Sequence, residues 1–176
     1  MAPKSHSSQQ GFTLIELLIV VAIISIIAAV AVPNLLKTKQ SGNEVSAATS
    51  LKAVSQAQVG YSLSCGNGGY ATAFATLGVP SPGTNESFLS EDLTSAVNPV
   101  KANYVFSIAP GADAAVGEND CNGTATQSAY YASAVPQTFG QTGSRSFAVT
   151  GRGMVWQVYA AAPPPEPFSA PATPFR

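Results

Sequence analysis

An apolar run near the N-terminus constrains this chain of 176 residues more than any other feature does. Across residues 17–32 the only residue that is not hydrophobic is Ser25. The wider segment 12–36 would be about 37 Å long as an α-helix, which is enough to cross a bilayer. It is longer than the apolar core of a cleaved signal peptide, and helix-compatible sequence follows it. We therefore expect a membrane-spanning helix over 12–36.

A single carboxylate, Glu16, lies at the start of this segment. An acid near the centre of a spanning helix costs about 2.5–3.5 kcal/mol on insertion scales, and less toward the interface. Glu16 is therefore either an interfacial residue that reaches the headgroups or a residue with a cationic partner in the membrane. No Lys or Arg lies within two helical turns of it. Cleavage of the chain after Gly11 would create a cation nearby, the new α-amino group.

The sequence GFTLIE at residues 11–16, followed by an apolar helix that contains Pro33, resembles the class III leader of type IV pilins and pseudopilins. The resemblance implies that a prepilin peptidase cuts between Gly11 and Phe12 on the cytoplasmic face and methylates the Phe12 amine. It also implies that Glu16 serves assembly and that Pro33 kinks the helix. It covers residues 10–36, less than a fifth of the chain.

The chemistry of the motif fits these roles. Gly11 has no side chain, so the scissile bond is unobstructed for an intramembrane protease. Glu16 can neutralise the Phe12 ammonium of a neighbouring subunit, and in a low dielectric such a pair penalises any register that leaves a charge unmatched. The expected partners are further copies in a homo-oligomeric filament, the prepilin peptidase and the inner-membrane assembly machinery. The expected location is the inner membrane before assembly, with a single pass, and then the periplasm or cell surface.

The rest of the chain predicts an α+β head. Apolar spacing predicts that the helix continues to about residue 63, with Lys52, Ser55 and Gln56 off its buried face. Alternation and β-branched or aromatic residues predict an antiparallel sheet, with a hairpin turn at 150–153. The resemblance implies that the helix lies across this sheet. The expected buried helix positions are Ala47, Leu51, Val54, Gln58 and Tyr61, and the expected strands are 103–109, 128–136, 144–150 and 153–159.

Smaller features complete the expected organisation. Gly78 should stop one helical turn, and Ser90 should cap a second short helix. Most of the head's aromatic residues, Tyr131 and Trp156 among them, should fill the core between helix and sheet. The proline-rich tail should be extended, exposed and mobile. The expected divisions are a leader at 1–11, the assembly helix at 12–36, its amphipathic continuation at 37–63, the head at 64–160 and the tail at 161–176.

The two cysteines, Cys65 and Cys121, favour a disulfide if the head lies outside the cytoplasm. The alternative is two unrelated buried thiols. A zinc site would need histidine partners, and the sole histidine is His6 in the leader.

No catalytic or metal site is expected. Removal of the leader removes the histidine that a serine or cysteine nucleophile needs. The chain has no run of Lys or Arg, so nucleic-acid binding is not expected. Residues 111–123 hold Asp113, Glu118 and Asp120, and a calcium loop there is a minor alternative to a solvated loop because the spacing departs from the usual pattern.

These observations favour a structural subunit of a type IV pilus-like filament. The alternatives are a pseudopilin of a type II secretion system and a minor pilin that serves adhesion or DNA uptake. A membrane-anchored enzyme or binding domain is a fourth possibility, from another class of protein. Glu16 counts against it, because a plain anchor gains nothing from a carboxylate.

Processing should occur after Gly11, because a polar leader ends there and the apolar helix begins at once. We expect intact mass or N-terminal sequencing of membrane-extracted protein to give methyl-Phe12 as the first residue. A mature chain that begins beyond Val32 would indicate an ordinary signal peptide and would contradict the filament interpretation.

Overall fold

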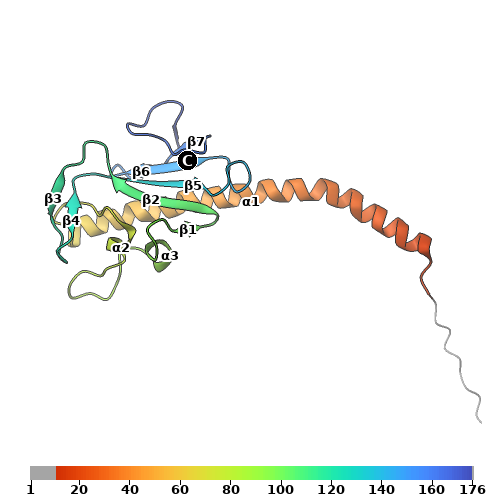
Figure 1. Cartoon of the computed structure of the whole chain (residues 1–176), viewed down its shortest axis with the longest axis horizontal. Coiled ribbons are helices and arrows are strands. Elements are labelled where there is room, and N and C mark those ends of the chain that lie inside the picture. The colour runs from red at the N-terminus through yellow and green to blue at the C-terminus, as the bar shows by residue number, and fades with distance from the viewer. Residues whose placement is uncertain (1–10, 176) are drawn as a thin grey trace, which may run out of the picture. The chain divides into compact units, whose positions relative to one another are not determined.

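The computed structural model describes residues 11–175, so all of the expected leader except Gly11 lies outside the described residues. The chain divides into two compact units, one that ends at Thr38 and one that begins at Lys39. A long helix, α1 (Leu14–Ser64), begins in the first unit and ends in the second (Figure 1). The second unit adds an antiparallel sheet, which confirms the expected α+β class.

The first unit contains the apolar part of α1. The helix is long and apolar enough to cross a membrane, and none of its most apolar window is buried. A core helix of a soluble protein would bury that window, so these side chains need lipid or another protein around them. The helix is continuous through Pro33. A kink at Pro33 stays a prediction.

The second unit packs the amphipathic part of α1 against the sheet. All five helix positions expected to be buried are buried, including the polar side chain of Gln58. The Gln58 amide is satisfied, because it donates to the Ala71 carbonyl at 2.7 Å and accepts from the Ala71 N–H at 2.9 Å. Ser55 was expected off this face but is buried, because the turn at Gly153 closes over it.

The main sheet has six antiparallel strands. The four expected strands are present within three residues of their expected starts, and the expected hairpin turn joins two of them. Short strands at both edges, and a separate two-stranded ribbon, were not expected. The six strands, in spatial order, are β1 (Val100–Lys101), β2 (Tyr104–Pro110), β5 (Tyr130–Pro136), β6 (Ser146–Thr150), β7 (Trp156–Val158) and β8 (Thr173–Pro174), and the ribbon pairs β3 (Val116–Asn119) with β4 (Ala125–Gln127).

Aromatic side chains fill the core between α1 and the sheet. Five of the expected ones are fully buried there: Tyr61, Tyr104, Phe106, Tyr130 and Phe147. Tyr131 and Trp156 are not in this core. They are half-buried and contact Phe168 of the C-terminal segment, at ring-centroid distances of 6.3 and 5.3 Å. Alternation along β5 explains the difference for Tyr131, because its neighbour Tyr130 already faces the helix.

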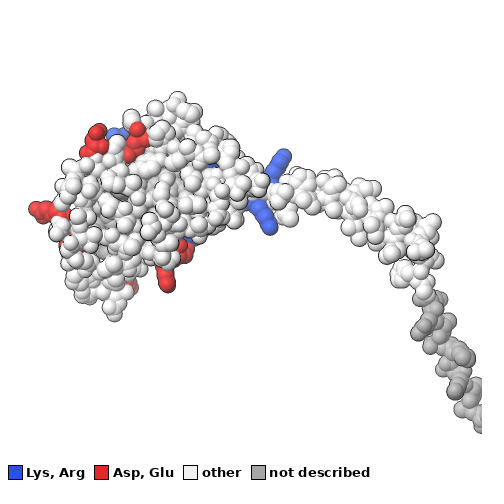
Figure 2. Space-filling model, viewed as in Figure 1, with Lys and Arg blue, Asp and Glu red and all other residues white. Residues whose placement is uncertain are grey.

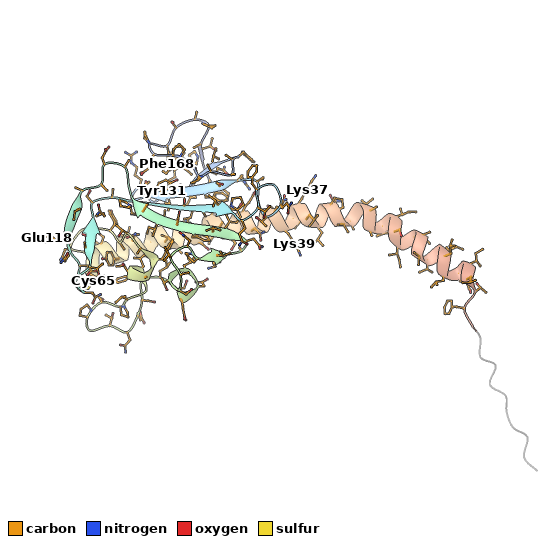
Figure 3. All side chains as sticks on the ribbon, in the orientation of Figure 1. Lys37, Lys39, Cys65, Glu118, Tyr131 and Phe168 are labelled. Carbon is orange, nitrogen blue, oxygen red and sulfur yellow. A yellow bond between two sulfur atoms is a disulfide. The ribbon has the colours of Figure 1, made fainter. Side chains whose placement is uncertain are left out.

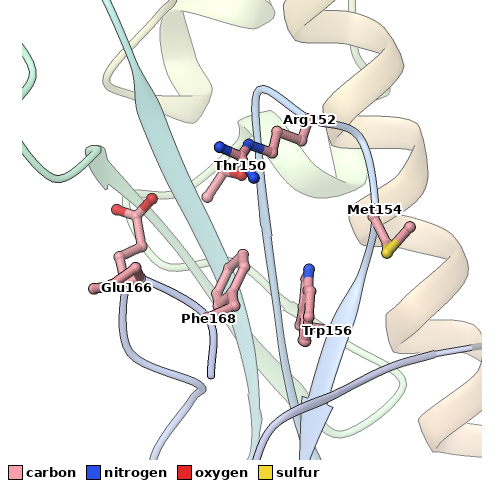
Figure 4. Close-up of a pocket in the computed structure, with 7 residues that line it drawn as sticks. Thr150, Arg152, Met154, Trp156, Glu166 and Phe168 are labelled. Atoms are coloured by element: carbon pink, nitrogen blue, oxygen red, sulfur yellow. The ribbon is translucent and has the colours of Figure 1, made fainter. Parts of the chain in front are cut away.

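The proline-rich tail is exposed at more than half of its described residues, as expected, but several of its residues pack against the head. The Tyr131 hydroxyl donates to the Pro164 carbonyl at 2.6 Å, and Phe168 stacks beside Trp156 (Figure 4). Phe175 packs edge-on against Phe147, and its N–H donates to the Val155 carbonyl, just before β7, at 2.8 Å. Partial burial of these two phenylalanines gives the tail contacts that its proline content alone does not predict.

Two short helices precede the sheet. Gly78 ends α2 (Phe74–Leu77), as expected. Ser90 stands at the N-cap position of α3 (Glu91–Thr94), but its side chain makes no capping bond. The Ser90 hydroxyl donates to the Asp92 carboxylate instead, so the expected side-chain cap is wrong.

A buried ion pair joins α1 to the loop before β6. Glu44 is only 4% exposed, and its carboxylate accepts bonds from the Ser144 N–H at 2.7 Å and the Arg145 Nε at 2.8 Å. Burial alone raises the pKa of the Glu44 carboxyl. The bonds from the Ser144 backbone, from Arg145 and from the Ser144 hydroxyl, together with the Arg145 charge, outweigh burial and lower the pKa below its ordinary value.

The expected disulfide is confirmed. Cys65, just after α1, pairs with Cys121 in the turn between β3 and β4, at a Cα–Cα distance of 4.8 Å. Beside it the Cys121 N–H donates to the Cys65 carbonyl at 2.8 Å. The Tyr61 hydroxyl donates to the Asp120 carboxylate at 2.7 Å, and burial and this bond raise the pKa of Tyr61. The end of α1 is therefore fixed to the ribbon.

Glu44→Gln should destabilise the head in a pH-dependent way. At pH 7 we expect the free energy of unfolding to fall by about 1–3 kcal/mol, because the charged acceptor of Arg145 is lost. A lowered folded-state pKa stabilises the fold above the unfolded value of about 4.3, and this contribution disappears as pH falls through the folded value. The difference between wild type and variant should therefore shrink in acid.

Urea unfolding of the detergent-solubilised chain, followed by the fluorescence of its only tryptophan, measures this difference. Glu86→Gln, in an exposed loop, is the control and should leave stability unchanged. An equal loss for Glu44→Gln at pH 7 and pH 3 would show that charge is not the cause.

Reduction of the Cys65–Cys121 bond should destabilise the head by up to about 4 kcal/mol, since the closed loop spans 56 positions. Unfolding midpoints of oxidised protein and of Cys65→Ser/Cys121→Ser give the difference. Thiol labelling of denatured, non-reduced protein from outside the cytoplasm should find no free thiol, and two freely alkylated cysteines would refute the bond.

Candidate functional site: the N-terminal assembly motif

The candidate site is the start of α1, where the residues of the predicted processing motif follow one another. Gly11 and Phe12 precede the helix, which begins at Leu14. The Phe12 side chain is 89% exposed. The bond expected to be cut therefore lies in extended chain just before regular structure, where a protease can reach the backbone.

Glu16 is held in place by Thr13, a residue that the sequence reasoning did not assign. The Glu16 carboxylate accepts bonds from the Thr13 N–H at 2.9 Å and from the Thr13 hydroxyl at 2.7 Å. The Glu16 N–H in turn donates to the Thr13 hydroxyl oxygen at 3.3 Å. This reciprocal arrangement is a capping box. Its signal, a threonine three residues before a glutamate that opens an apolar run, is present in the sequence.

The capping box changes how Glu16 is understood. The carboxylate has donors within its own chain, so its lone pairs are partly satisfied before any neighbour arrives. A carboxylate is also favoured at a helix N-terminus by the helix dipole. Hydrogen bonds from Thr13 leave the negative charge in place, however. Cleavage before Phe12 would place an ammonium four residues from that charge, in the same chain and in each neighbour.

The polar side chains farther along the apolar part of α1 bond to the helix itself. Ser25 donates to the Val21 carbonyl at 2.8 Å, and Asn34 donates to the Val30 carbonyl at 3.2 Å. Each is a bond to the preceding turn, which satisfies the Ser25 hydroxyl hydrogen and one of the two Asn34 amide hydrogens. This surface is suited to lipid or to other apolar helices, and Glu16 is its only formal charge up to residue 36.

The loop considered for calcium does not bring its acids together. Asp120 is buried and accepts bonds from the Asn122 and Thr124 N–H groups, while Asp113 and Glu118 are exposed. Among the described residues no three His, Cys, Asp or Glu side chains gather closely enough to hold a metal ion.

A cavity of about 390 Å³ lies between the C-terminal segment and the sheet (Figure 4). Its walls include Trp156 and Phe168, together with the charged residues Arg152 and Glu166. The Glu166 carboxylate accepts a bond from the Ala112 N–H at 2.7 Å, so it fixes the tail to the loop after β2.

Comparison with known proteins places the N-terminal motif in a described class. Residues 6–32 match the model of the prokaryotic N-terminal methylation motif. No solved structure matches the chain.

Three relatives each match a part of the chain. The chain is 49% identical over 55 residues to the type IV major pilin protein PilA of Myxococcus xanthus, which is 31% of this chain and 25% of that protein. It is 40% identical over 82 residues to the type IV wide pilus major component PilA4 of Thermus thermophilus, 45% of this chain and 61% of the relative. It is 40% identical over 60 residues to the type II secretion system core protein G of Vibrio cholerae, 34% of this chain and 41% of the relative.

The fold and the motif define a class of protein with an exposed apolar N-terminal helix on an α+β head. The methylation motif and the relatives support the type IV pilin and pseudopilin family for this chain, which confirms the resemblance seen in residues 11–16. The chain spans less than two thirds of the length of each of these relatives.

Proposed function

We propose that this chain is a structural subunit of a type IV pilus-like filament that assembles through residues 12–36. The observation that carries the proposal is an apolar helix, unburied in the described chain, with one carboxylate a helical turn after the methylation motif's predicted cleavage site. Two of the relatives that the chain matches are named as pilus components. The family's subunits are structural, and we propose no catalytic role.

The first step is processing in the inner membrane. The precursor is a single-pass protein, and the prepilin peptidase cuts between Gly11 and Phe12 on the cytoplasmic face. Methylation keeps the Phe12 amine basic, so it stays an ammonium at neutral pH. Thr13 becomes the second residue of the mature chain and still caps the helix.

The second step is lateral packing of helices by the assembly machinery. An ammonium in or near hydrocarbon is costly unless a carboxylate meets it. Only a register that brings Phe12 of one copy to Glu16 of another satisfies both charges between chains. The apolar side chains up to Leu36 then pack against one another when the helix leaves the lipid. Charge sets the register, and apolar burial stabilises the filament.

A pseudopilin of a type II secretion system is the second candidate. The match to the core protein G of such a system favours it. A pilus subunit and a pseudopilin use the same kind of N-terminal helix, but they form different assemblies. Abundant long filaments sheared from the cell surface would favour the pilus, while retention of the chain in the periplasm would favour the pseudopilin.

Glu16→Gln should block assembly and spare insertion and processing. The amide keeps an acceptor for Thr13 but removes the charge, so a neighbour's Phe12 ammonium is left unpaired. A loss of about 1.4 kcal/mol at a contact is a tenfold change in its equilibrium constant, and a broken buried pair typically costs about 3–5 kcal/mol, less near the interface. We expect sheared-filament yield to fall at least about tenfold, while membrane level and cleavage persist.

Thr13→Val is the matched control, because it removes the hydroxyl of the capping box and keeps the Glu16 charge. We expect it to form filaments at a moderately reduced yield. Normal filaments from Glu16→Gln would show that the charge is incidental. Equal loss in Thr13→Val and Glu16→Gln would show that helix capping, and not charge pairing, is what assembly needs.

A further inference from the structure

The head is acidic and its cations are few. Residues 39–175 carry five Lys or Arg and eight Asp or Glu. Acidic side chains are spread over the visible face of the head (Figure 2). Of the five cations, Arg145 and Lys101 pair with Glu44 and Asp92 in the chain. Heads of like charge repel one another when they are crowded, so the remaining cations matter for any contact between copies.

Lys39 stands at one end of the head. The next residue, Gln40, donates to the carbonyls of Gly140 and Gln141 at 2.8 and 2.9 Å, which places this part of α1 beside the loop after β5. The Lys39 side chain is exposed. In the same loop the Phe139 ring is 47% exposed. This end therefore offers a cation and, in the loop that Gln40 contacts, an accessible aromatic ring.

Glu118 stands at the opposite end, on the β3–β4 ribbon (Figure 3). Its side chain is exposed, and that of Val116 on the same strand is 75% exposed. The ribbon is firmly held, because the Thr126 hydroxyl donates to the Glu118 carbonyl at 2.7 Å and the disulfide fixes the turn to the end of α1. This end offers an anion next to an apolar side chain on a preorganised surface.

The two ends cannot meet within one chain. The helix from Gln40 to Cys65 is about 37 Å long at 1.5 Å per residue. At physiological salt, exposed charges interact over about 8 Å. Among residues 11–175 neither Lys39 nor Glu118 forms an ion pair. Opposite charges at opposite ends of one body match when copies are arranged head to tail, which is the geometry that generates helical filaments.

We propose that the Lys39 and Phe139 end of one copy binds the Glu118 and Val116 end of another copy in the filament. This proposal rests on the proposed function. Lys37 lies two residues earlier on the same helix, about 200° around it, and supplies a second cation that can serve a different neighbour. Exposed ion pairs contribute little each, but across an interface they select the register and exclude wrong partners.

Zero-length carbodiimide coupling of sheared filaments tests the contact directly. The reagent joins a lysine to a carboxylate only when the two touch. We expect mass spectrometry to find a Lys39–Glu118 crosslink in filaments and to lose it in detergent-dispersed monomers at the same protein concentration. A Lys39–Glu118 crosslink of equal yield in monomers, or its absence from filaments in which other crosslinks form, would overturn the proposal.

Charge exchange provides the second test. Lys39→Glu and Glu118→Lys should each lower filament yield at least about threefold, and the double variant should return to within about twofold of wild type because the pair is restored with reversed sign. Lys52→Glu and Glu86→Lys make the same charge changes at other exposed positions and should have little effect. An unchanged yield in both single variants, or a double variant worse than either, would overturn the proposal.

Glu16→Gln, assayed in parallel, separates this inference from the proposed function. If Glu16→Gln abolishes filaments while the Lys39 and Glu118 variants assemble normally, the filament function stands and the head contact is wrong. If wild-type protein forms no filament of any kind, the proposed function fails first. Unchanged membrane levels of each variant show that folding is intact.

Discussion

The buried carboxylate of Glu44 requires a counter-ion inside the head, and several parts of the head contribute to holding it in place. A charge that is 4% exposed on a helix must have a fixed counter-ion, because an unpaired charge there would cost several kcal/mol. Arg145 supplies it, and the same guanidinium donates to Gln157 on β7 and lies over the rings of Tyr159 and Phe175. One cation thus joins α1, the sheet and the C-terminal segment. The tail is ordered where it can cover Arg145 and the sheet face beside it.

Sequence pattern predicted those parts of the fold that local periodicity determines. The spacing of Leu51, Val54 and Tyr61 identified the buried face of α1, and alternation identified the central strands. Pattern did not predict β1, β3, β4 or β8, which are two to four residues long and too short to show a period. Pattern did not predict the packing of the tail on the head, because it depends on Phe168 and Phe175 meeting aromatic residues, several of them distant in sequence.

The candidate site depends on a local signal, because all of its groups lie within six consecutive residues. The roles of Gly11, Phe12 and Glu16 follow from the resemblance of residues 11–16 to the processing motif, and they stay predictions. Thr13 was not assigned from the sequence, although its signal is equally local. The charge of Glu16 indicates an ion pair with another chain and does not by itself indicate a helix cap. The surfaces that the head offers to other copies could not be predicted from the sequence. That Lys39 and Glu118 lie at opposite ends follows only from the path of α1, the disulfide and the loop beside Gln40.

The two parts of α1 bury their apolar side chains in different ways. From Lys39 onward the helix has its own sheet to cover its apolar face, so the head can fold without neighbours. Before Thr38 the described chain offers the apolar side chains no cover, and only lipid or other copies can bury them. Apolar packing alone lets such helices shift along one another at little cost, because every register buries a similar apolar area. In the filament proposed above, the charged pair at Glu16 and the ionic contacts between heads would supply the position-specific energy that apolar packing lacks.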